Sequence, residues 1–172
     1  MRIGVFDSPL GEVVLTGDDD GVAGLLLGPG ARAEVPGLPR DDAAFREAGE
    51  QLAQWFAGER TAFDLPLAPA GTPFRQRVRD LLRQVPYGTT TTYGALARQL
   101  GGLGASRAVG VACARNPLGI VVPCHRVIGA DGTLTGFAAG LPRKRWLLAH
   151  EQQHSGAPGC ADTGPGADRP GS

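Results

Sequence analysis

The charge of this 172-residue chain reverses sign near Gly71, in a segment where proline and glycine cluster. Residues 1–72 carry a net charge of −7 and contain no lysine, whereas residues 73–151 carry +8. The remaining C-terminal residues add −1, so the whole chain is neutral. A reversal of this size divides the chain into two parts with different surfaces, and 172 residues are enough for one good core or two small ones.

We therefore expect an N-terminal domain over residues 1–71, a second domain over 72–151 and a disordered Gly/Pro-rich tail over 152–172. A basic half in a neutral protein is typical of a domain that binds a polyanion, because phosphate neutralisation supplies most non-specific affinity for nucleic acid. A solvated arginine-rich surface is the alternative interpretation of the same charge.

The cysteines and the apolar runs limit the class of protein. The first twenty residues have neither a basic start nor a continuous apolar core, and no later run approaches the roughly 18 apolar residues that a membrane span needs. We therefore expect a cytoplasmic protein with no membrane contact. Cys113, Cys124 and Cys160 form an odd set without C-x-x-C spacing, which favours neither a disulfide framework nor a structural zinc site. At least one thiol is thus expected to be free for chemistry.

The N-terminal part has the pattern of a small α+β domain. Arg2–Phe6, Glu12–Thr16 and Val22–Leu27 are short apolar-rich segments separated by turn signals, which predicts a β-meander. Apolar residues at helical spacing between Asp41 and Phe56 predict a helix that covers one face of this sheet, with Asp41 or Asp42 as its cap. Its aromatic residues are interpreted as core packing, so we assign no chemistry to this part.

The C-terminal part is predicted to be mainly helical. Short helices joined by a glycine-rich turn at residues 101–104 suggest a helix-turn-helix. The side chains at 108, 110, 112 and 114 are small, which suits close packing against another helix or close approach to a DNA groove. The predicted helices are 73–85 capped by Thr72, 93–99 capped by Thr92, 107–115 capped by Ser106, and a last helix opened by Pro142.

The candidate nucleophile is Cys124, which precedes His125. Gly119–Val122 is an apolar run suited to a buried strand, and Pro123 stops it. Most cysteines are structural, but this one lies among groups that favour the thiolate, which is the reactive form. Neighbours on a regular strand point to opposite faces, so a relay between the two side chains requires a turn at Pro123 or a bridging water.

The wider string gives a stronger signal than the dipeptide. Asn116-Pro117 followed by Ile120–Gly129 resembles the active-site signature of O6-alkylguanine-DNA alkyltransferases. The resemblance covers most of residues 72–151 and implies a helical, winged-helix-like (helix-turn-helix) domain. Residues 1–71 agree with the family only in general shape, a small ribonuclease-H-like antiparallel sheet with a helix. The further matching segments are 86–90, 92–94, 106–110, 134–136 and 143–151.

The resemblance implies a catalytic set. Cys124 would be the alkyl acceptor, and His125 would take its proton through a water. Glu151 would hold the imidazole in the required tautomer and stabilise its positive form. Tyr93 would donate to the guanine ring nitrogen, and Asn116 would tie together the turn between helix and active-site strand.

The same resemblance implies a DNA-binding set. Arg107 would replace an extruded nucleotide in the base stack while the helix 107–115 lies in the minor groove. Backbone groups of Val127 and Ala138 would bind the flipped base. Ala139 stands where many members have glycine, and its methyl group is expected to slow reaction with bulky adducts relative to methyl. The other substrate-binding positions are Thr92, Ser106, Gly110 and Cys113, the last as a pocket wall that is not needed for methyl transfer.

The expected function is direct-reversal DNA repair, in which the O6-alkyl group of guanine in duplex DNA moves irreversibly to Cys124, once per molecule. No metal and no cofactor is implied, because all nucleophiles and proton donors are side chains, and we expect a monomer. Three alternatives remain open at this point: a non-catalytic lesion sensor, a cysteine hydrolase that turns over many times, and a helix-turn-helix regulator that does not consume its thiol.

Overall fold

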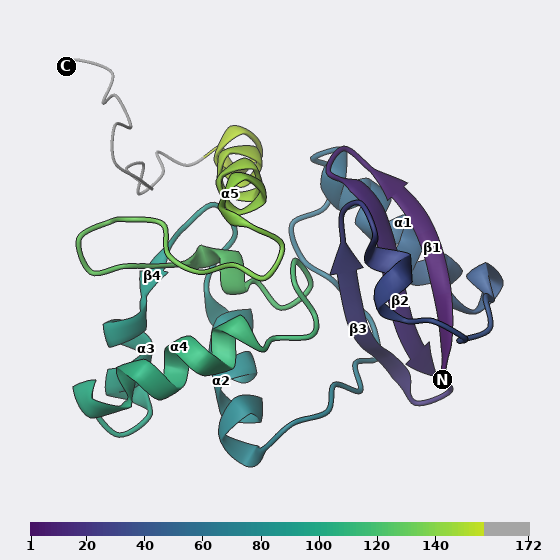
Figure 1. Cartoon of the computed structure of the whole chain (residues 1–172). Coiled ribbons are helices and arrows are strands. Elements are labelled where there is room, and N and C mark those ends of the chain that lie inside the picture. Colours follow the sequence, from purple (N-terminus) through teal and green to yellow (C-terminus); the bar gives the residue numbers. More distant parts are fainter. Residues whose placement is uncertain (157–172) are drawn as a thin grey trace. The chain divides into compact units, whose positions relative to one another are not determined.

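The computed structural model describes residues 1–156, which form two compact units (Figure 1). One unit contains residues 1–70 together with 117–121, and the other contains residues 71–116 and the described residues from 122 onward. The chain therefore returns to its first unit once, immediately before the candidate nucleophile. Cys160 lies outside the described residues.

The first unit contains the predicted three-stranded meander, and the expected α+β fold class is confirmed. Strand order is β1-β2-β3, all antiparallel, and two-residue turns join the strands. The strands extend to these turns and are therefore longer than predicted. The central strand is buried on both faces, since consecutive residues Val13, Val14 and Leu15 are at most 1% exposed. The strand bounds are Arg2–Ser8 for β1, Gly11–Asp18 for β2 and Gly21–Leu27 for β3.

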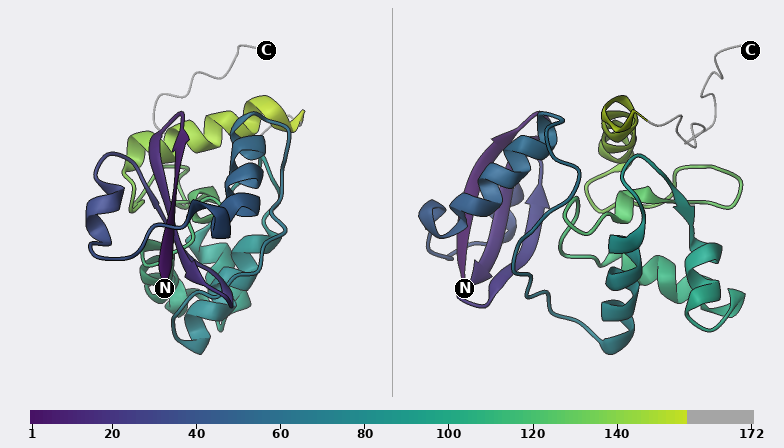
Figure 2. Two further views of the ribbon diagram at one scale, coloured as in Figure 1. Left: turned by 90° about the vertical axis from the view of Figure 1, so that its right-hand side faces the viewer. Right: turned by 180° about the vertical axis from the view of Figure 1, so that it is seen from behind.

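The predicted helix over 41–56 is present, but its first turn is a 3-10 helix, Asp42–Phe45, that continues into α1, Arg46–Phe56. Asp41 is the cap, because its side chain accepts a hydrogen bond from the backbone N–H of Ala44 at 3.2 Å. Helix α1 lies across one face of the sheet (Figure 2), and Trp55 is fully buried, as expected of core packing. A second 3-10 turn, Ala31–Glu34, packs on β2.

The prediction of a strand over Gly119–Val122 is wrong. Leu118 makes a single bridge to Leu25, after which the chain turns, with Ile120 in the left-handed region at φ 72°. It is the one non-glycine residue with positive φ among residues 1–156. Leu118 and Ile120 are nevertheless buried, as expected of the apolar run. Burial of such side chains stabilises the fold by about 2 kcal/mol each, which offsets the roughly 1–2 kcal/mol cost of the left-handed conformation.

The second unit contains the predicted helices. Thr72 and Thr92 cap their helices by accepting hydrogen bonds from Arg75 N–H at 3.2 Å and Ala95 N–H at 3.0 Å. The helix opened by Pro142 runs through Ser155, into the range predicted as tail. The helices are α2, Pro73–Gln84; α3, Tyr93–Gln99; α4, Ser106–Ala114; and α5, Leu141–Ser155.

Ser106 is not a helix cap, which corrects the prediction. A 3-10 turn over Leu103–Ala105 leads directly into α4, so Ala105 is the residue before the helix and Ser106 already has helical φ and ψ of −57° and −40°. A side chain inside the first turn cannot occupy the capping position. Helices α3 and α4 pack against each other across this turn, as the helix-turn-helix prediction requires.

A two-stranded parallel sheet connects the helical pair to the reactive segment. Strand β4, Thr91–Thr92, immediately precedes α3, and β5, Val127–Ile128, immediately follows the segment around Cys124. Thr91 pairs with Val127 and Thr92 with Ile128. This pairing fixes the start of α3 beside the reactive segment.

Replacing Gly21 by alanine is expected to lower the free energy of unfolding by about 2 to 3 kcal/mol. Gly21 has φ 138°, and a Cβ there would lie 2.4 Å from the carbonyl oxygen of Pro66, which also accepts the N–H of Val22. Urea unfolding measures the effect. Gly30→Ala is the control, because Gly30 has φ 86° and open space around it, so only about 1 kcal/mol of backbone strain is expected there. Equal losses in the two variants would contradict the clash.

Candidate active site

The reactive segment turns sharply after Pro123. Residues Cys124–Arg126 form a 3-10 helix in which Arg126 N–H donates to the carbonyl of Pro123 at 3.1 Å. The predicted turn at Pro123 is therefore present. Cys124, His125 and Arg126 are 7%, 0% and 6% exposed, so this turn buries three reactive or charged side chains in succession. Burying such groups is costly unless they are paired.

The pairing partner is Glu151 on α5. His125 Nε2 lies 2.7 Å from Glu151 Oε1, and Arg126 donates to both carboxylate oxygens, from Nη2 to Oε1 at 2.7 Å and from Nε to Oε2 at 2.9 Å. The N–H of Gly88 also donates to Oε2, at 3.2 Å. Burial alone would raise the pKa of Glu151, but its hydrogen bonds with His125 and Arg126 and the charge of Arg126 outweigh burial and lower it to about 2. Glu151 is therefore an anion, and the ring nitrogen facing it carries the proton.

Burial lowers the pKa of His125 more than the carboxylate of Glu151 raises it. The imidazole is therefore neutral in the resting site, with Nδ1 as its basic nitrogen. A neutral imidazole oriented by a buried carboxylate can accept a proton and is then stabilised as a cation. This arrangement is that of a general base.

The environment of Cys124 differs from the sequence expectation in one respect. Burial raises the pKa of the thiol, and this effect exceeds the opposing effects of a hydrogen bond from the Asn116 side chain and the charge of Lys144. The groups that favour the thiolate are Asn116 and Lys144 rather than the adjacent His125 and Arg126, and they do not outweigh burial. The resting thiol is therefore protonated and needs a base before it can react.

Asn116 connects the end of α4 to the reactive segment. Its backbone N–H donates to the carbonyl of Cys113 at 3.1 Å, and its Nδ2 donates to the carbonyl of Val122 at 2.8 Å. Cys113 is buried, which raises the pKa of its thiol to about 12 and leaves it protonated and unreactive. Unlike Cys124, which accepts a hydrogen bond from the Asn116 side chain, Cys113 has no hydrogen bond among the causes that shift its pKa.

Tyr93, the first residue of α3, is half-buried. Its hydroxyl oxygen accepts a hydrogen bond from Thr135 Oγ1 at 3.2 Å, and burial raises its pKa, so the hydroxyl keeps its proton at neutral pH. A Cβ at Gly110 would lie 4.0 Å from the Tyr93 ring, an ordinary van der Waals contact, so this position of α4 faces the ring without crowding it.

Of the remaining predicted binding residues, Val127 is fully buried in β5, and the others lie on exposed or half-buried surface of the second unit. Arg107 and Ala138 are exposed, and Ala139 is half-buried, with its carbonyl accepting a hydrogen bond from Arg143 at 3.0 Å. Of the small residues on α4, Ala112 is buried, whereas Ala108 and Ala114 are exposed. The structure therefore brings together the catalytic set, while the DNA-binding set contains more exposed positions.

Two buried charged residues of the site were missed from the sequence, Arg126 as the partner of Glu151 and Lys144 as a buried cation. Lys144 is 0% exposed, and its Nζ donates to the carbonyls of Val127 and Thr135, each at 2.6 Å. A signal was present for Lys144, because it stands seven residues before Glu151 with Leu147 and Leu148 between them. This spacing places both charges on the apolar face of one helix.

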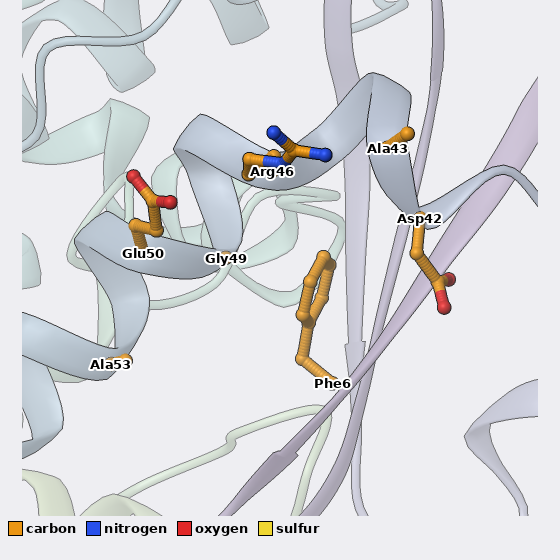
Figure 3. Close-up of a pocket in the computed structure, with 7 residues that line it drawn as sticks. All are labelled: Phe6, Asp42, Ala43, Arg46, Gly49, Glu50 and Ala53. Carbon is orange, nitrogen blue, oxygen red and sulfur yellow. The ribbon is translucent and has the colours of Figure 1, made fainter.

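Other candidate sites do not share these residues. Within residues 1–156, no group of three or more His, Cys, Asp or Glu side chains is placed to hold a metal ion. A hollow of about 440 Å³ in the first unit lies beside Phe6 of β1 and Gly49 of α1, and none of its lining residues belongs to the cluster around Cys124 (Figure 3). In the described part of the chain, the helices are too short or too polar to cross a membrane.

Acidification is expected to destabilise the protein in two stages. The unfolded chain binds protons at His125 near pH 6.5 and at Glu151 near 4.5, whereas in the folded chain both pKa values are lower. Protons therefore favour the unfolded chain. The first loss begins below pH 6.5, and the contribution of Glu151, on the order of 3 kcal/mol, is present above pH 4.5 and disappears as the pH falls toward 2. Thermal melts between pH 8 and 3 measure this, and a Tm that is constant over that range would contradict it.

Comparison with known proteins gives a consistent family. The model of the 6-O-methylguanine DNA methyltransferase DNA binding domain matches residues 73–153, and the model of that family's ribonuclease-like domain matches residues 1–69. A protein from Methanosarcina acetivorans named methylated-DNA–protein-cysteine methyltransferase is 48% identical over 153 residues, covering 88% of this chain and 98% of the relative. A protein of the same name from Mycolicibacterium paratuberculosis is 47% identical over 152 residues, covering 88% and 92%.

Solved structures give the same result. The crystal structure of Mycobacterium tuberculosis O6-methylguanine methyltransferase matches with a TM-score of 0.79 and 43% identity, covering 89% of this chain and 93% of that one. The structure of Mycobacterium tuberculosis OGT in complex with DNA matches with a TM-score of 0.81 and 42% identity, covering 90% and 94%. The resemblance noted in the sequence is thereby confirmed, and this chain belongs to the 6-O-methylguanine DNA methyltransferase family.

Proposed function

We propose that this protein repairs alkylated DNA by direct reversal, moving the O6-alkyl group of guanine in a duplex to Sγ of Cys124. The observation that carries the proposal is the buried relay in which Cys124 is followed by His125, whose Nε2 lies 2.7 Å from Glu151 Oε1. The relatives named methylated-DNA–protein-cysteine methyltransferase support a transferase, and the DNA-bound relative supports duplex DNA as the partner.

The reaction is a displacement at a saturated carbon. The thiol proton of Cys124 passes through a bridging water to Nδ1 of His125, and Glu151 stabilises the imidazolium that forms. The sulfur electron pair forms a new S–C bond, the C–O6 bond breaks, and its electrons remain on the guanine. Tyr93, which keeps its proton at neutral pH, donates to the guanine ring nitrogen as negative charge develops there.

The product explains why each molecule would act once. A thioether has no good leaving group, so the alkyl group stays on Cys124 and no second water is needed. Side chains supply every proton and the nucleophile, so the proposed reaction includes no metal or cofactor. The relay, the tyrosine and the asparagine all come from one chain, which supports a monomer as the active form, and we propose that it acts in the cytoplasm.

The burial of Cys124 supports extrusion of the target nucleotide. A base stacked in a duplex cannot bring its O6 substituent to the sulfur of a cysteine that is only 7% exposed, so the nucleotide must leave the stack. Arg107 is exposed near the start of α4 and would fill the vacated space, while small exposed residues such as Ala108 allow α4 to lie close to the minor groove.

The base pocket would be formed mainly by backbone. The carbonyl of Val127 accepts a hydrogen bond from Lys144 but has a second lone pair for the base, and Ala138 offers backbone groups in the loop before α5. Cys113 would form a buried wall. Thr92, which caps α3, and Ser106 and Gly110 on α4 would support the surface that meets DNA.

Mass analysis of Cys124 tests the proposal. Cleavage after Arg107, Arg115 and Arg126 places Cys113 in peptide 108–115 and Cys124 in peptide 116–126, so the two buried thiols are distinguished. After incubation with an O6-methylguanine duplex, peptide 116–126 is expected to gain one methylene mass, with one methyl per molecule, and guanine to be restored. Cys113→Ser is the matched control and should keep the transfer, and an unmodified duplex should give none. Lesion binding without a mass change would favour the sensor alternative, and repeated turnover would favour a hydrolase.

Ala139→Gly is expected to raise the rate with O6-benzylguanine relative to O6-methylguanine. The half-buried Ala139 methyl group would narrow the space beside the adduct, and one methyl group in a pocket changes relative rates by about tenfold or more. Single-turnover rates on the two duplexes give the ratio, with Ala138→Gly as the neighbouring control. An unchanged benzyl-to-methyl ratio would refute a steric role for Ala139.

A further inference from the structure

Arg126 shares the carboxylate of Glu151 with His125. Its guanidinium donates hydrogen bonds to both carboxylate oxygens, whereas the imidazole contacts only Oε1. Two further contacts hold Arg126 in place: Nη1 donates to the carbonyl of Val85 at 2.6 Å, and Cζ lies 5.6 Å from the centre of the Tyr87 ring. Bidentate hydrogen bonding of this kind fixes the position of a carboxylate and favours its ionised form.

The charges around the imidazole oppose one another. From α5, Glu151 is negative and favours a protonated ring, whereas Lys144 is positive and disfavours it. From its own turn, Arg126 also disfavours protonation, and Cys124 is uncharged at rest. Tyr87, which packs against Arg126, keeps its proton because burial raises its pKa to about 12. In a buried site each of these charges acts strongly, since water does not screen it. Without Arg126, burial and Lys144 would still disfavour the protonated ring, but the charge of Glu151 would meet less opposition.

We propose that Arg126 is a positioning residue that adds to the effect of burial by offsetting part of the charge of Glu151, so that His125 stays neutral at rest and can accept the proton of Cys124 at neutral pH. The inference rests on the proposed function, in which His125 is the base. The guanidinium of Arg126 contributes a positive charge held in a fixed position beside the carboxylate.

The test compares a variant that removes the charge of Arg126 with one that keeps the charge but changes the shape of the side chain. The three histidines of the chain are titrated by NMR, with His125 assigned by its loss in His125→Gln. Arg126→Met removes the charge and is expected to raise the titration midpoint of His125 by about one pH unit or more. Arg126→Lys keeps the positive charge but lacks the forked guanidinium. It is expected to leave the titration midpoint of His125 within a few tenths of a pH unit of the original value. A midpoint unmoved in Arg126→Met, or moved equally in both variants, would overturn the proposal.

A second readout is the pH profile of methyl transfer. The acid limb of the single-turnover rate should move upward with the His125 midpoint in Arg126→Met and stay in place in Arg126→Lys, whereas a merely structural role would lower both rates without moving the limb. The NMR measurement uses no DNA, so absence of transfer would count against the proposed function without affecting the test of Arg126.

Two further variants keep the test decisive even if Arg126→Met does not fold. Removing one partner of a buried ion pair can unfold a protein, whereas replacing both is often tolerated. Arg126→Gln, which keeps a polar group for the carbonyl of Val85, is the second charge-removing variant and is expected to raise the midpoint as Arg126→Met does. In Arg126→Met/Glu151→Gln, where no negative charge remains, the His125 midpoint is expected not to exceed that of the original protein. A raised midpoint in this double variant would show that Arg126 does not act through Glu151.

Discussion

Glu151→Gln is expected to slow methyl transfer by about 10² to 10⁴-fold, the contribution that a well-placed general base makes to a reaction. The carboxylate orients His125 and would stabilise its protonated form, and a neutral amide cannot do the second. The variant also leaves Arg126 buried with no negative partner, which costs about 3 to 5 kcal/mol. Single-turnover kinetics on an O6-methylguanine duplex measure the rate, and circular dichroism measures folding.

Two controls make the result specific. Glu50→Gln removes an exposed carboxylate from α1 and should leave the rate unchanged. The affinity of Glu151→Gln for the duplex should also stay close to that of the original protein, because the residue is fully buried and cannot touch DNA. A folded Glu151→Gln protein that transfers methyl at the original rate would remove His125 and Glu151 from the mechanism.

Lys144→Met is expected to lower the free energy of unfolding by about 2 to 4 kcal/mol and to slow alkylation of Cys124 at neutral pH. The carbonyls of Val127 and Thr135 would each lose a donor at 2.6 Å. The thiol would also lose a positive charge that favours its ionised form. Urea unfolding and the rate of iodoacetamide labelling of peptide 116–126 measure the two effects.

Arg145→Met is the matched control for Lys144→Met. It removes one positive charge from the adjacent position of α5, but Arg145 is exposed, so the change should alter stability by less than about 0.5 kcal/mol. Equal effects of the two substitutions would mean that net charge, and not the buried contacts of Lys144, sets the behaviour of the site.

Local signals in the sequence predicted most of the helices and strands. Thr72, Thr92 and Pro142 each mark a helix start through hydrogen bonds or backbone geometry within a few residues, and the structure has helices at all three. Ser106 failed because capping depends on the turn before it, which is helical here. The apolar run 119–122 failed because burial alone does not distinguish an extended strand from a turn such as that at Ile120.

The sequence predicted which residues make up the active site, but not all of the contacts between them. Its nucleophile and base are adjacent in sequence, and the family resemblance connects them to Glu151. Arg126 contacts the same carboxylate as His125, on a helix that begins 15 positions after Arg126, at Leu141. No local sequence pattern indicates this contact between Arg126 and Glu151. Likewise, a cysteine beside a histidine and an arginine looks activated, whereas the folded chain buries it and leaves it protonated.

The burial of Cys124 has a consequence for the spent molecule. Cys124 is 7% exposed, so the methyl group that its sulfur would keep stays among buried side chains. Adding one carbon to a packed core typically costs about 1 to 3 kcal/mol. A used molecule would then unfold more readily than a fresh one, and cellular proteases, which act on unfolded chains, could discard it selectively.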